Sequence, residues 1–208
     1  MKKLLKFISS YFFLILFLLI LNYSKSFAIN LITDVETFAS EDEIYVVVEI
    51  PKNTNEKWEV SKINGNLEPD YYMGLPRIIT YGNYPINYGM IPRTVSPVRE
   101  GGDGDPLDVI IFGDKIKRGE IVKAKVVGII FMEDLGQNDN KVIATLNKED
   151  KSFKISSENT ELNEVIEWFK NYKKKGYIKY NGLGFKDDAL KYIKMSVKDF
   201  KRYGVKKR

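Results

Sequence analysis

The chain has 208 residues and contains neither cysteine nor histidine. These absences exclude disulfide frameworks, thiolate catalysis, His-dependent Ser or Cys triads and His-ligated zinc sites. The formal net charge is +5, but residues 1–28 carry four lysines and no acidic residue, so residues 29–208 have a net charge of only +1. A nearly neutral segment of this length can form one domain with a full hydrophobic core, and its charge gives no reason to expect nucleic acid as a partner.

The N-terminal segment has the three parts of a secretory signal peptide. Three lysines lie within the first six residues, an unbroken apolar run extends from Tyr11 to Leu21, and the small residues Ser26 and Ala28 precede Ile29. The alternative is an uncleaved membrane anchor, but the apolar run is shorter than the roughly 20 helical residues that cross a hydrocarbon core. We therefore expect residues 1–28 to be a signal peptide cleaved after Ala28, and residues 29–208 to be the exported domain.

Residues 43–146 have the pattern of successive short β-strands. β-branched and aromatic residues dominate four runs, which are Ile44–Ile50, Val109–Phe112, Ile121–Met132 and Val142–Leu146. Turn signals separate them, including Asn64-Gly65, Gly101-Gly102 and Gly113-Asp114. Strands that follow one another without intervening helices favour a barrel or sandwich over a parallel sheet.

Two helices are predicted after these strands. The first has apolar residues at the three-and-four spacing of one buried face, namely Leu162, Val165, Ile166, Phe169 and Tyr172. Thr160 is expected to cap its start, and Gly176 follows its end. The second runs from about Asp187 to Tyr203, and its apolar face consists of Ala189, Ile193, Val197 and Phe200. The pattern predicts a single α+β domain that is mainly β.

The loop before Val109 carries three aspartates, Asp103, Asp105 and Asp108, within six residues. Carboxylates that converge repel one another, and one of them takes up a proton unless cations neutralise the group. Hard divalent cations with oxygen ligands are the natural counter-ions. A solvated acidic turn is the alternative, whereas an EF-hand loop fits poorly because Leu107 occupies a ligand position.

Further acidic residues are placed to join this loop. Asp134 and Asp139 lie in a turn between two predicted strands, and Glu49 shares the inward face of its strand with Val47. An inward carboxylate needs a partner, which a metal or a lysine would provide. The bases and phenols available to bind phosphate are Lys57, Arg77, Lys141, Lys173, Tyr84, Tyr88 and Tyr172. Cationic side chains that face carboxylate-bound metals suit phosphoryl transfer.

Six motifs resemble, in order, those of the family I soluble inorganic pyrophosphatases. They are Glu49-Ile-Pro, Lys57-Trp-Glu59, Tyr84-Pro-Ile-Asn-Tyr88-Gly, Asp103-Gly-Asp-Pro-Leu-Asp108, Glu133-Asp134 with Asp139-Asn-Lys141, and Asn171-Tyr172-Lys173. The resemblance covers about residues 43–173. It implies a small closed β-barrel of OB type with two C-terminal helices packed against it. It also implies hydrolysis of diphosphate to two orthophosphates by attack of a metal-activated water, with several Mg²⁺ ions.

The resemblance also implies a role for each matching residue. The metal ligands would be Asp103, Asp108, Asp139, Asp134 and Glu49. The substrate-binding residues would be Lys57, Arg77, Tyr88, Lys141, Tyr172 and Lys173. Asp105 would be the general base, and Glu59 would support the site. Residues 64–81 follow the family pattern loosely, so Arg77 has the fewest matching neighbours.

Other interpretations of the sequence lead to different classes of protein. OB-type barrels bind single-stranded nucleic acid through basic, aromatic grooves, whereas the barrel mouth predicted here is acidic. A structural calcium-binding protein would share the acidic loop without the hydrolytic activity. We expect a periplasmic or secreted homo-oligomer, a hexamer or a dimer, that meets a membrane only through its signal segment. The alternative is a cytoplasmic location, which is usual for the family.

Overall fold

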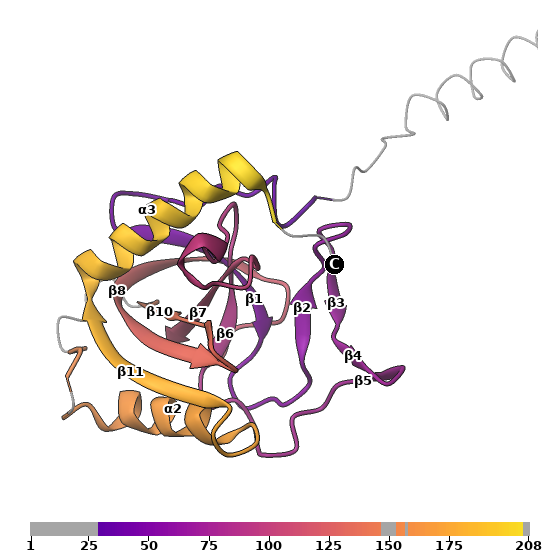
Figure 1. Ribbon diagram of the computed structural model, residues 1–208, viewed down its shortest axis with the longest axis vertical. Helices are drawn as coiled ribbons and strands as arrows, with labels where there is room; N and C mark the ends of the chain where they lie inside the picture. The colour runs from indigo at the N-terminus through magenta and orange to yellow at the C-terminus, as the bar shows by residue number, and fades with distance from the viewer. Residues whose placement is uncertain (1–28, 147–152, 157, 206–208) are drawn as a thin grey trace, which may run out of the picture.

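Figure 1 shows the computed structural model, which describes residues 29–146, 153–156 and 158–205. The predicted signal segment lies outside these residues. The elements in chain order are β1 (Glu43–Ile50), β2 (Trp58–Val60), β3 (Leu67–Pro69), β4 (Tyr71–Tyr72), β5 (Leu75–Pro76), β6 (Asn87–Ile91), a 3-10 turn η1 (Val98–Glu100), β7 (Leu107–Phe112), β8 (Ile121–Asp134), β9 (Gln137–Asn138), β10 (Lys141–Thr145), α2 (Thr160–Asn171), β11 (Ile178–Phe185) and α3 (Lys186–Tyr203). Among the described residues, no helix combines the length and the apolarity needed to span a membrane.

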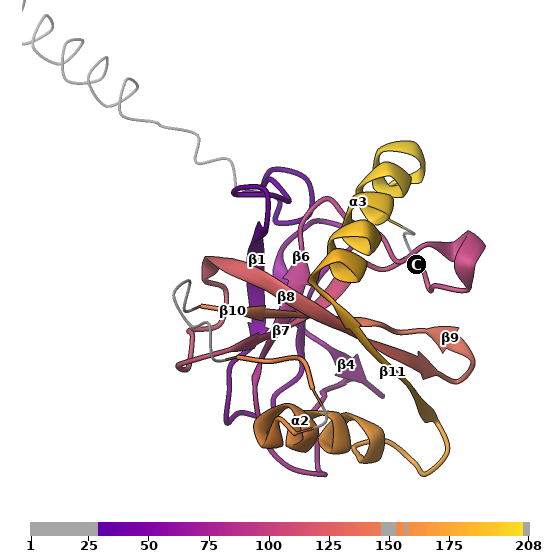
Figure 2. The ribbon, with the colours of Figure 1, turned by 90° about the vertical axis from the view of Figure 1, so that its left-hand side faces the viewer.

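The main sheet has the strand order β1-β6-β7-β10-β8-β11. β8 also pairs antiparallel with β1, so the path of hydrogen-bonded strands returns from β8 to its first strand. The long β8 makes this possible, because its first residues pair with β1, its middle with β10 and its last residues with β11 (Figure 2). β7 and β10 are parallel, and the other pairs of the main sheet are antiparallel.

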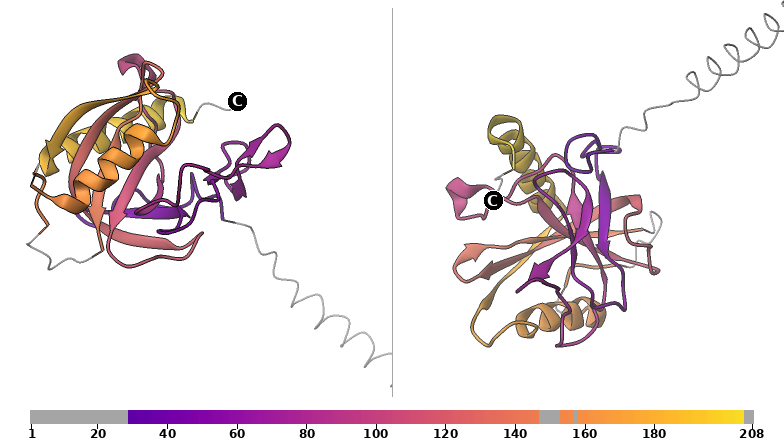
Figure 3. Two further views of the ribbon diagram at one scale, coloured as in Figure 1. Left: turned by 90° about the horizontal axis from the view of Figure 1, so that it is seen from below. Right: turned by 90° about the vertical axis from the view of Figure 1, so that its right-hand side faces the viewer.

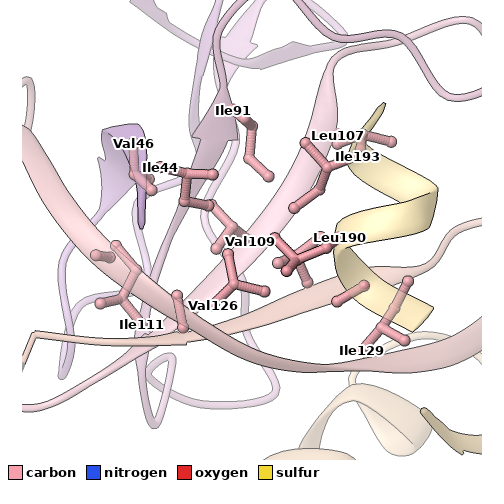
Figure 4. Close-up of a cluster of buried hydrophobic side chains, with 14 of the residues drawn as sticks. Ile44, Val46, Ile91, Leu107, Val109, Ile111, Val126, Ile129, Leu190 and Ile193 are labelled. Atoms are coloured by element: carbon pink, nitrogen blue, oxygen red, sulfur yellow. The ribbon is translucent and has the colours of Figure 1, made fainter. Parts of the chain in front are cut away.

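Two hydrophobic cores lie on the two faces of these strands. Alternation along β7 places Val109 and Ile111 in one core and Ile110 and Phe112 in the other. α3 covers the first core, where Ile193 packs among the strand residues (Figure 4), and α2 covers the second. Each fully buried aliphatic side chain of this kind contributes about 1.5–3 kcal/mol of transfer free energy. The two helices thus bury both faces of the strands that carry the acidic loops.

β2 to β5 form two small antiparallel sheets outside the main one, and Figure 3 shows them from below and from the right-hand side of Figure 1. The predicted Asn64-Gly65 turn joins β2 to β3. Gly89 is required by a close backbone approach between β6 and β1. A Cβ at this position would lie 2.1 Å from the carbonyl oxygen of Val47, so a larger residue would push the two strands apart.

The four predicted strands are present, with ends that differ by two residues at most. The two predicted helices are also present, but Asn159 rather than Thr160 caps the first, because the Asn159 side chain accepts the backbone N–H of Leu162. The sequence analysis assigned no element to β11. Its Asn181-Gly182 pair resembles a turn, yet here it forms an irregularity within a strand that pairs with β8.

Candidate functional site

A cavity of about 390 Å³ opens where several strand ends and the end of α2 meet. All thirteen residues that the sequence analysis assigned to a site line this cavity. They are Glu49, Lys57, Glu59, Arg77, Tyr88, Asp103, Asp105, Asp108, Asp134, Asp139, Lys141, Tyr172 and Lys173. The residues come from segments up to 124 positions apart in the sequence, between Glu49 and Lys173. The fold therefore brings the predicted groups together at one place.

The parallel pairing of β7 with β10 creates the centre of the site. Its register sets Lys141 beside Asp108. The Lys141 ammonium lies 2.5 Å from Asp108 Oδ2 and also donates to Asp139 Oδ1. Its side chain is only 3% exposed, and the rings of Tyr88 and Phe169 lie 5.8 and 6.0 Å away. A buried lysine is thus held between two carboxylates and two aromatic rings.

Burial and charge act in opposite directions on this group. Burial alone would lower the pKa of Lys141, but the charges of Asp108 and Asp139 raise it above its usual value. Burial would raise the pKa of Asp108, yet the charge and hydrogen bond of Lys141, together with a hydrogen bond from Tyr88, hold it below its usual value. Burial and the nearby Asp108 charge raise the pKa of Asp139 to about 7. Burial therefore disfavours the charged form of Asp139, whereas Lys141 and Tyr88 favour that of Asp108.

The acidic loop is fixed by its own backbone. Asp103 Oδ1 accepts the N–H of Asp105 at 2.9 Å, and the Asp105 carbonyl accepts the N–H of Ser96 at 2.6 Å. Burial, followed by the charges of its neighbours Asp105 and Asp108, raises the pKa of Asp103. The Asp105 side chain forms an ion pair with Lys62, and its Oδ1 lies 2.7 Å from the Lys62 ammonium. The sequence analysis missed Lys62, which no motif contains.

Glu49 occupies the inward position predicted from strand alternation and is 5% exposed. Its Oε1 accepts the backbone N–H of Val60 at 2.7 Å. Burial raises the pKa of Glu49 to about 8, although this hydrogen bond opposes the shift. The carboxyl group is therefore largely neutral at pH 7 in the protein without bound cations.

Arg118 holds the strand ends around Glu49 in place. Its guanidinium donates to the Glu49 carbonyl oxygen at 3.1 Å, forms an ion pair of 2.8 Å with Glu56 and lies 4.7 Å from the centre of the Trp58 ring. It thus connects the β7–β8 loop to β1 and to β2, which follows Lys57. Sequence analysis missed Arg118 because its contacts are 60 or more positions away in the chain.

A second wall of the cavity is basic. Lys57 lies 3.0 Å from both Glu59 and Asp70, and Arg77 lies 3.1 Å from the same Asp70 oxygen. Burial would raise the pKa of Asp70, but Lys57 and Arg77 hold it below its usual value. Asp70 is a site residue that the sequence analysis missed, because it lies in the segment that matches the motifs loosely. It orients both cations toward the cavity.

The end of α2 completes the site. The Tyr172 ring stacks on Trp168 with 5.0 Å between centroids and 9° between planes. The next residue, Lys173, donates to Asp134 Oδ2, while the buried Asp134 Oδ1 has no hydrogen-bond partner among the described residues. Burial raises the pKa of both Tyr172 and Tyr88, so their phenols remain protonated donors. Tyr84 is more deeply buried and contacts the rings of Tyr88, Trp168 and Phe169.

The donor set suits hard cations, and lysines neutralise only part of it. Within the described ranges, no three acidic residues lie at the mutual spacing of a metal site. Lys62, Lys141 and Lys173 instead pair with the carboxylates of the two acidic loops. The unpartnered oxygen of Asp134 and the raised pKa values of Asp103 and Asp139 indicate carboxylates that lack full neutralisation. Divalent cations, which prefer oxygen ligands, would supply the missing positive charge.

Comparison with known proteins gives a consistent result. The family model for inorganic pyrophosphatase matches residues 46–201. The inorganic pyrophosphatase of Helicobacter pylori is 34% identical over 172 residues, which are 76% of this chain and 92% of that protein. Inorganic pyrophosphatase 1 of Pseudomonas syringae is 36% identical, over 77% of this chain and 92% of that protein. A solved structure of the Helicobacter pylori enzyme has a TM-score of 0.66 and 30% identity, covering 80% of this chain and 98% of that one.

The raised pKa of Glu49 predicts a pH-dependent stability of the protein without bound cations. Between the unfolded pKa of 4.5 and the folded value of about 8, the folded chain keeps a proton that the unfolded chain has lost. The stabilisation is complete below the unfolded pKa and is lost as pH rises through the folded one. At about 1.4 kcal/mol per pKa unit, the free energy of unfolding should fall by on the order of 2–3 kcal/mol between pH 5.5 and 8.

Chemical denaturation of the EDTA-treated protein at these two pH values measures the effect. Glu49→Gln keeps an oxygen that accepts the Val60 N–H and cannot ionise, so its stability should depend less on pH. Glu41→Gln, at an exposed position, is the matched control and should behave like the unchanged protein. Equal pH dependence in the two variants would contradict the assignment.

Proposed function

This chain belongs to the inorganic pyrophosphatase family, and from that premise we propose that its acidic cavity is where pyrophosphate is hydrolysed to two orthophosphates. The observation that carries the proposal is the convergence, in one cavity, of two acidic loops with five basic side chains. The basic residues are Lys57, Lys62, Arg77, Lys141 and Lys173. Such a site can hold a small, highly charged anion and neutralise charge that develops on its oxygens.

We infer that Mg²⁺ ions occupy the acidic side of the cavity. Asp103, Asp108 and Asp139 would hold one ion, with Asp108 shared with a second, and Asp134 would serve a further one through its unpartnered oxygen. Glu49 would contact water around these ions. When bound, the cations neutralise phosphate oxygens and lower the pKa of a water molecule. Their charge would also lower the pKa of Asp103 and Asp139, against the rise that burial causes.

Asp105 is the residue we assign as the general base. The Asp103 side chain accepts the backbone N–H of Asp105. The Asp105 carboxylate reaches into the cavity toward Lys62. A carboxylate fixed in this way can accept a proton from the attacking water. Lys57 and Arg77 would bind phosphate oxygens from the second wall, where Asp70 orients them and Glu59 supports Lys57. Lys141, Lys173, Tyr88 and Tyr172 would donate from the other side.

We infer that the main sheet is a closed OB-type barrel. The support is the return of the pairing path to β1 after β6, β7, β10 and β8, with β7 and β10 parallel. OB folds are five-stranded Greek-key barrels with functional loops at the mouth. The site residues would then lie at the mouth of this barrel.

We also propose that the protein forms a hexamer or a dimer, and the family resemblance is the support for this proposal.

Activity should require Mg²⁺ and should be far higher on pyrophosphate than on a phosphate monoester. The reason is that several cationic side chains line one cavity together with the acidic loops, which suits a small anion of high charge. Phosphate release from pyrophosphate and from p-nitrophenyl phosphate, each with Mg²⁺, measures the difference. Ca²⁺ should inhibit because it is larger and tolerates looser coordination. Equal rates on both substrates would overturn the assignment.

Asp105→Asn should lose about 10²–10⁴-fold in kcat, the usual contribution of a general base, while keeping its fold and most of its metal affinity. Asp108→Asn is the contrasting variant, because Asp108 is assigned to metal binding. Its rate should recover in part at high Mg²⁺, whereas that of Asp105→Asn should not. A Mg²⁺ titration of both variants distinguishes the roles, and a near-normal rate for Asp105→Asn would refute the general-base role.

Export with cleavage after Ala28 is the proposed fate of the chain. The basic start, the apolar run and the small residues before Ile29 support it. Among the described residues, the first strand begins at Glu43. Fractionation and N-terminal sequencing should find Ile29 as the first residue of protein outside the cytoplasm. An intact Met1 on cytoplasmic protein would show the proposal to be wrong.

A further inference from the structure

Lys62 lines the cavity but belongs to none of the motifs that assigned the other side chains. It lies in the connection between β2 and β3, and its ammonium is 2.7 Å from Asp105 Oδ1. Its side chain is 15% exposed, so protein encloses most of it. Among the described residues, Lys62 is the only side chain that donates a hydrogen bond to the Asp105 carboxylate. The residue assigned as general base is thus paired with a lysine from a different part of the chain.

The backbone of Asp105 is fixed, whereas the orientation of its side chain depends on Lys62. The Asp105 N–H donates to Asp103 Oδ1 at 2.9 Å, and the Asp105 carbonyl oxygen accepts the N–H of Ser96 at 2.6 Å. These two bonds hold the backbone of the acidic loop. They leave the side-chain dihedral angles of Asp105 free to occupy more than one energy minimum. The ion pair with Lys62 selects one of these orientations.

The backbone that carries Lys62 is itself held in place. The Val60 N–H donates to Glu49 Oε1, which connects the end of β2 to β1. The Ser61 N–H donates to the Asn66 carbonyl oxygen at 2.8 Å, which closes the connection between β2 and β3. Because the neighbouring backbone is bonded and the side chain is largely enclosed, the Lys62 ammonium has little freedom to move away from its partner.

The carboxylate that Lys62 binds differs in role from those that the other lysines of the acidic loops bind. Lys141 and Lys173 pair with carboxylates that are assigned to Mg²⁺. Bound cations would compete with these two ammonium groups for the same oxygens. Asp105 is assigned to proton transfer instead, so its ion pair with Lys62 is compatible with occupied cation sites. Lys62 can therefore stay on Asp105 while the reaction proceeds.

We propose that Lys62 is a positioning residue, which holds the Asp105 carboxylate in the orientation that accepts a proton from the attacking water. The inference rests on the proposed function, because that function gives Asp105 the role of general base. A general base contributes about 10²–10⁴-fold to the rate, and a misplacement of about 1 Å can cost about 10²-fold. Loss of Lys62 should therefore lower kcat, although the group that takes the proton is still present.

Steady-state kinetics of Lys62→Met on pyrophosphate with Mg²⁺ tests this role. The kcat should fall by about 10–100-fold, and KM should change by less than about threefold. Lys62→Arg keeps the charge and the donors, so it should recover most of the rate. Lys52→Met is the matched control, because Lys52 forms an ion pair of 3.5 Å with Glu161 and its side chain is 28% exposed. This control should keep the rate of the unchanged protein.

A double-mutant cycle shows whether Lys62 acts through Asp105. In the Asp105→Asn background the carboxylate that Lys62 holds is gone, so adding Lys62→Met should lower kcat by less than about twofold more. If the two single losses multiply instead, the residues act independently and the proposal is wrong. A rise in KM with unchanged kcat would also overturn the proposal, since that result indicates a lysine that binds phosphate directly.

Further measurements separate positioning from other causes of a lower rate. Circular dichroism and thermal denaturation check that each variant folds, and Lys62→Gln replaces Lys62→Met in the cycle if the latter does not fold. High Mg²⁺ should not restore the rate of Lys62→Met, and recovery would overturn the proposal in favour of a role in cation binding. If the unchanged protein hydrolyses no pyrophosphate, or Asp105→Asn keeps a near-normal rate, the proposed function fails and this inference fails with it. If both behave as assigned but Lys62→Met keeps its rate, this inference alone is overturned.

Discussion

The buried ammonium of Lys141 is the interaction on which the site depends. It lies at the start of β10, where parallel pairing with β7 sets it beside Asp108, and the turn before β10 supplies Asp139. Removing one member of a buried charge pair typically costs about 3–5 kcal/mol, because the remaining charge is left without a partner. The strands, the two acidic loops and the aromatic wall from Tyr88 and Phe169 are therefore coupled through one cation.

The acidic cavity poses an electrostatic problem that the fold solves in several ways. Lysines neutralise some carboxylates, as Lys62 does for Asp105 and Lys173 for Asp134. Burial leaves protons on others, most clearly on Glu49. Both solutions are compatible with later binding of divalent cations, which would compete with ammonium groups and protons for the same oxygens. The cavity can thus exist before cations bind, with its carboxylates already held near one another.

Local sequence signals predicted the parts of the structure that depend on neighbouring residues. The inward position of Glu49 followed from alternation along β1, and the acidic loop before β7 was evident from three aspartates in six residues. Long-range contacts left no such signal. Lys62 and Asp105 are 43 positions apart, and Arg118 and Glu49 are 69 positions apart. β11 was missed because its irregularity at Asn181-Gly182 has the composition of a turn, while pairing with β8 decides its conformation.

The arrangement of β2 to β5 relates the catalytic site to the exposed surface. These strands lie outside the main sheet, yet backbone hydrogen bonds of 2.9, 2.9 and 2.7 Å connect Lys57, Asp70 and Arg77 across them. The side chains of Lys57 and Arg77 form the basic wall of the cavity, and Asp70 pairs with both of them. The hairpin between Asp70 and Arg77 needs no apolar side chains to maintain these bonds, since the backbone supplies them. The positions of Lys57 and Arg77 at the cavity therefore depend on backbone hydrogen bonds across β2 to β5 rather than on the side chains of the hairpin.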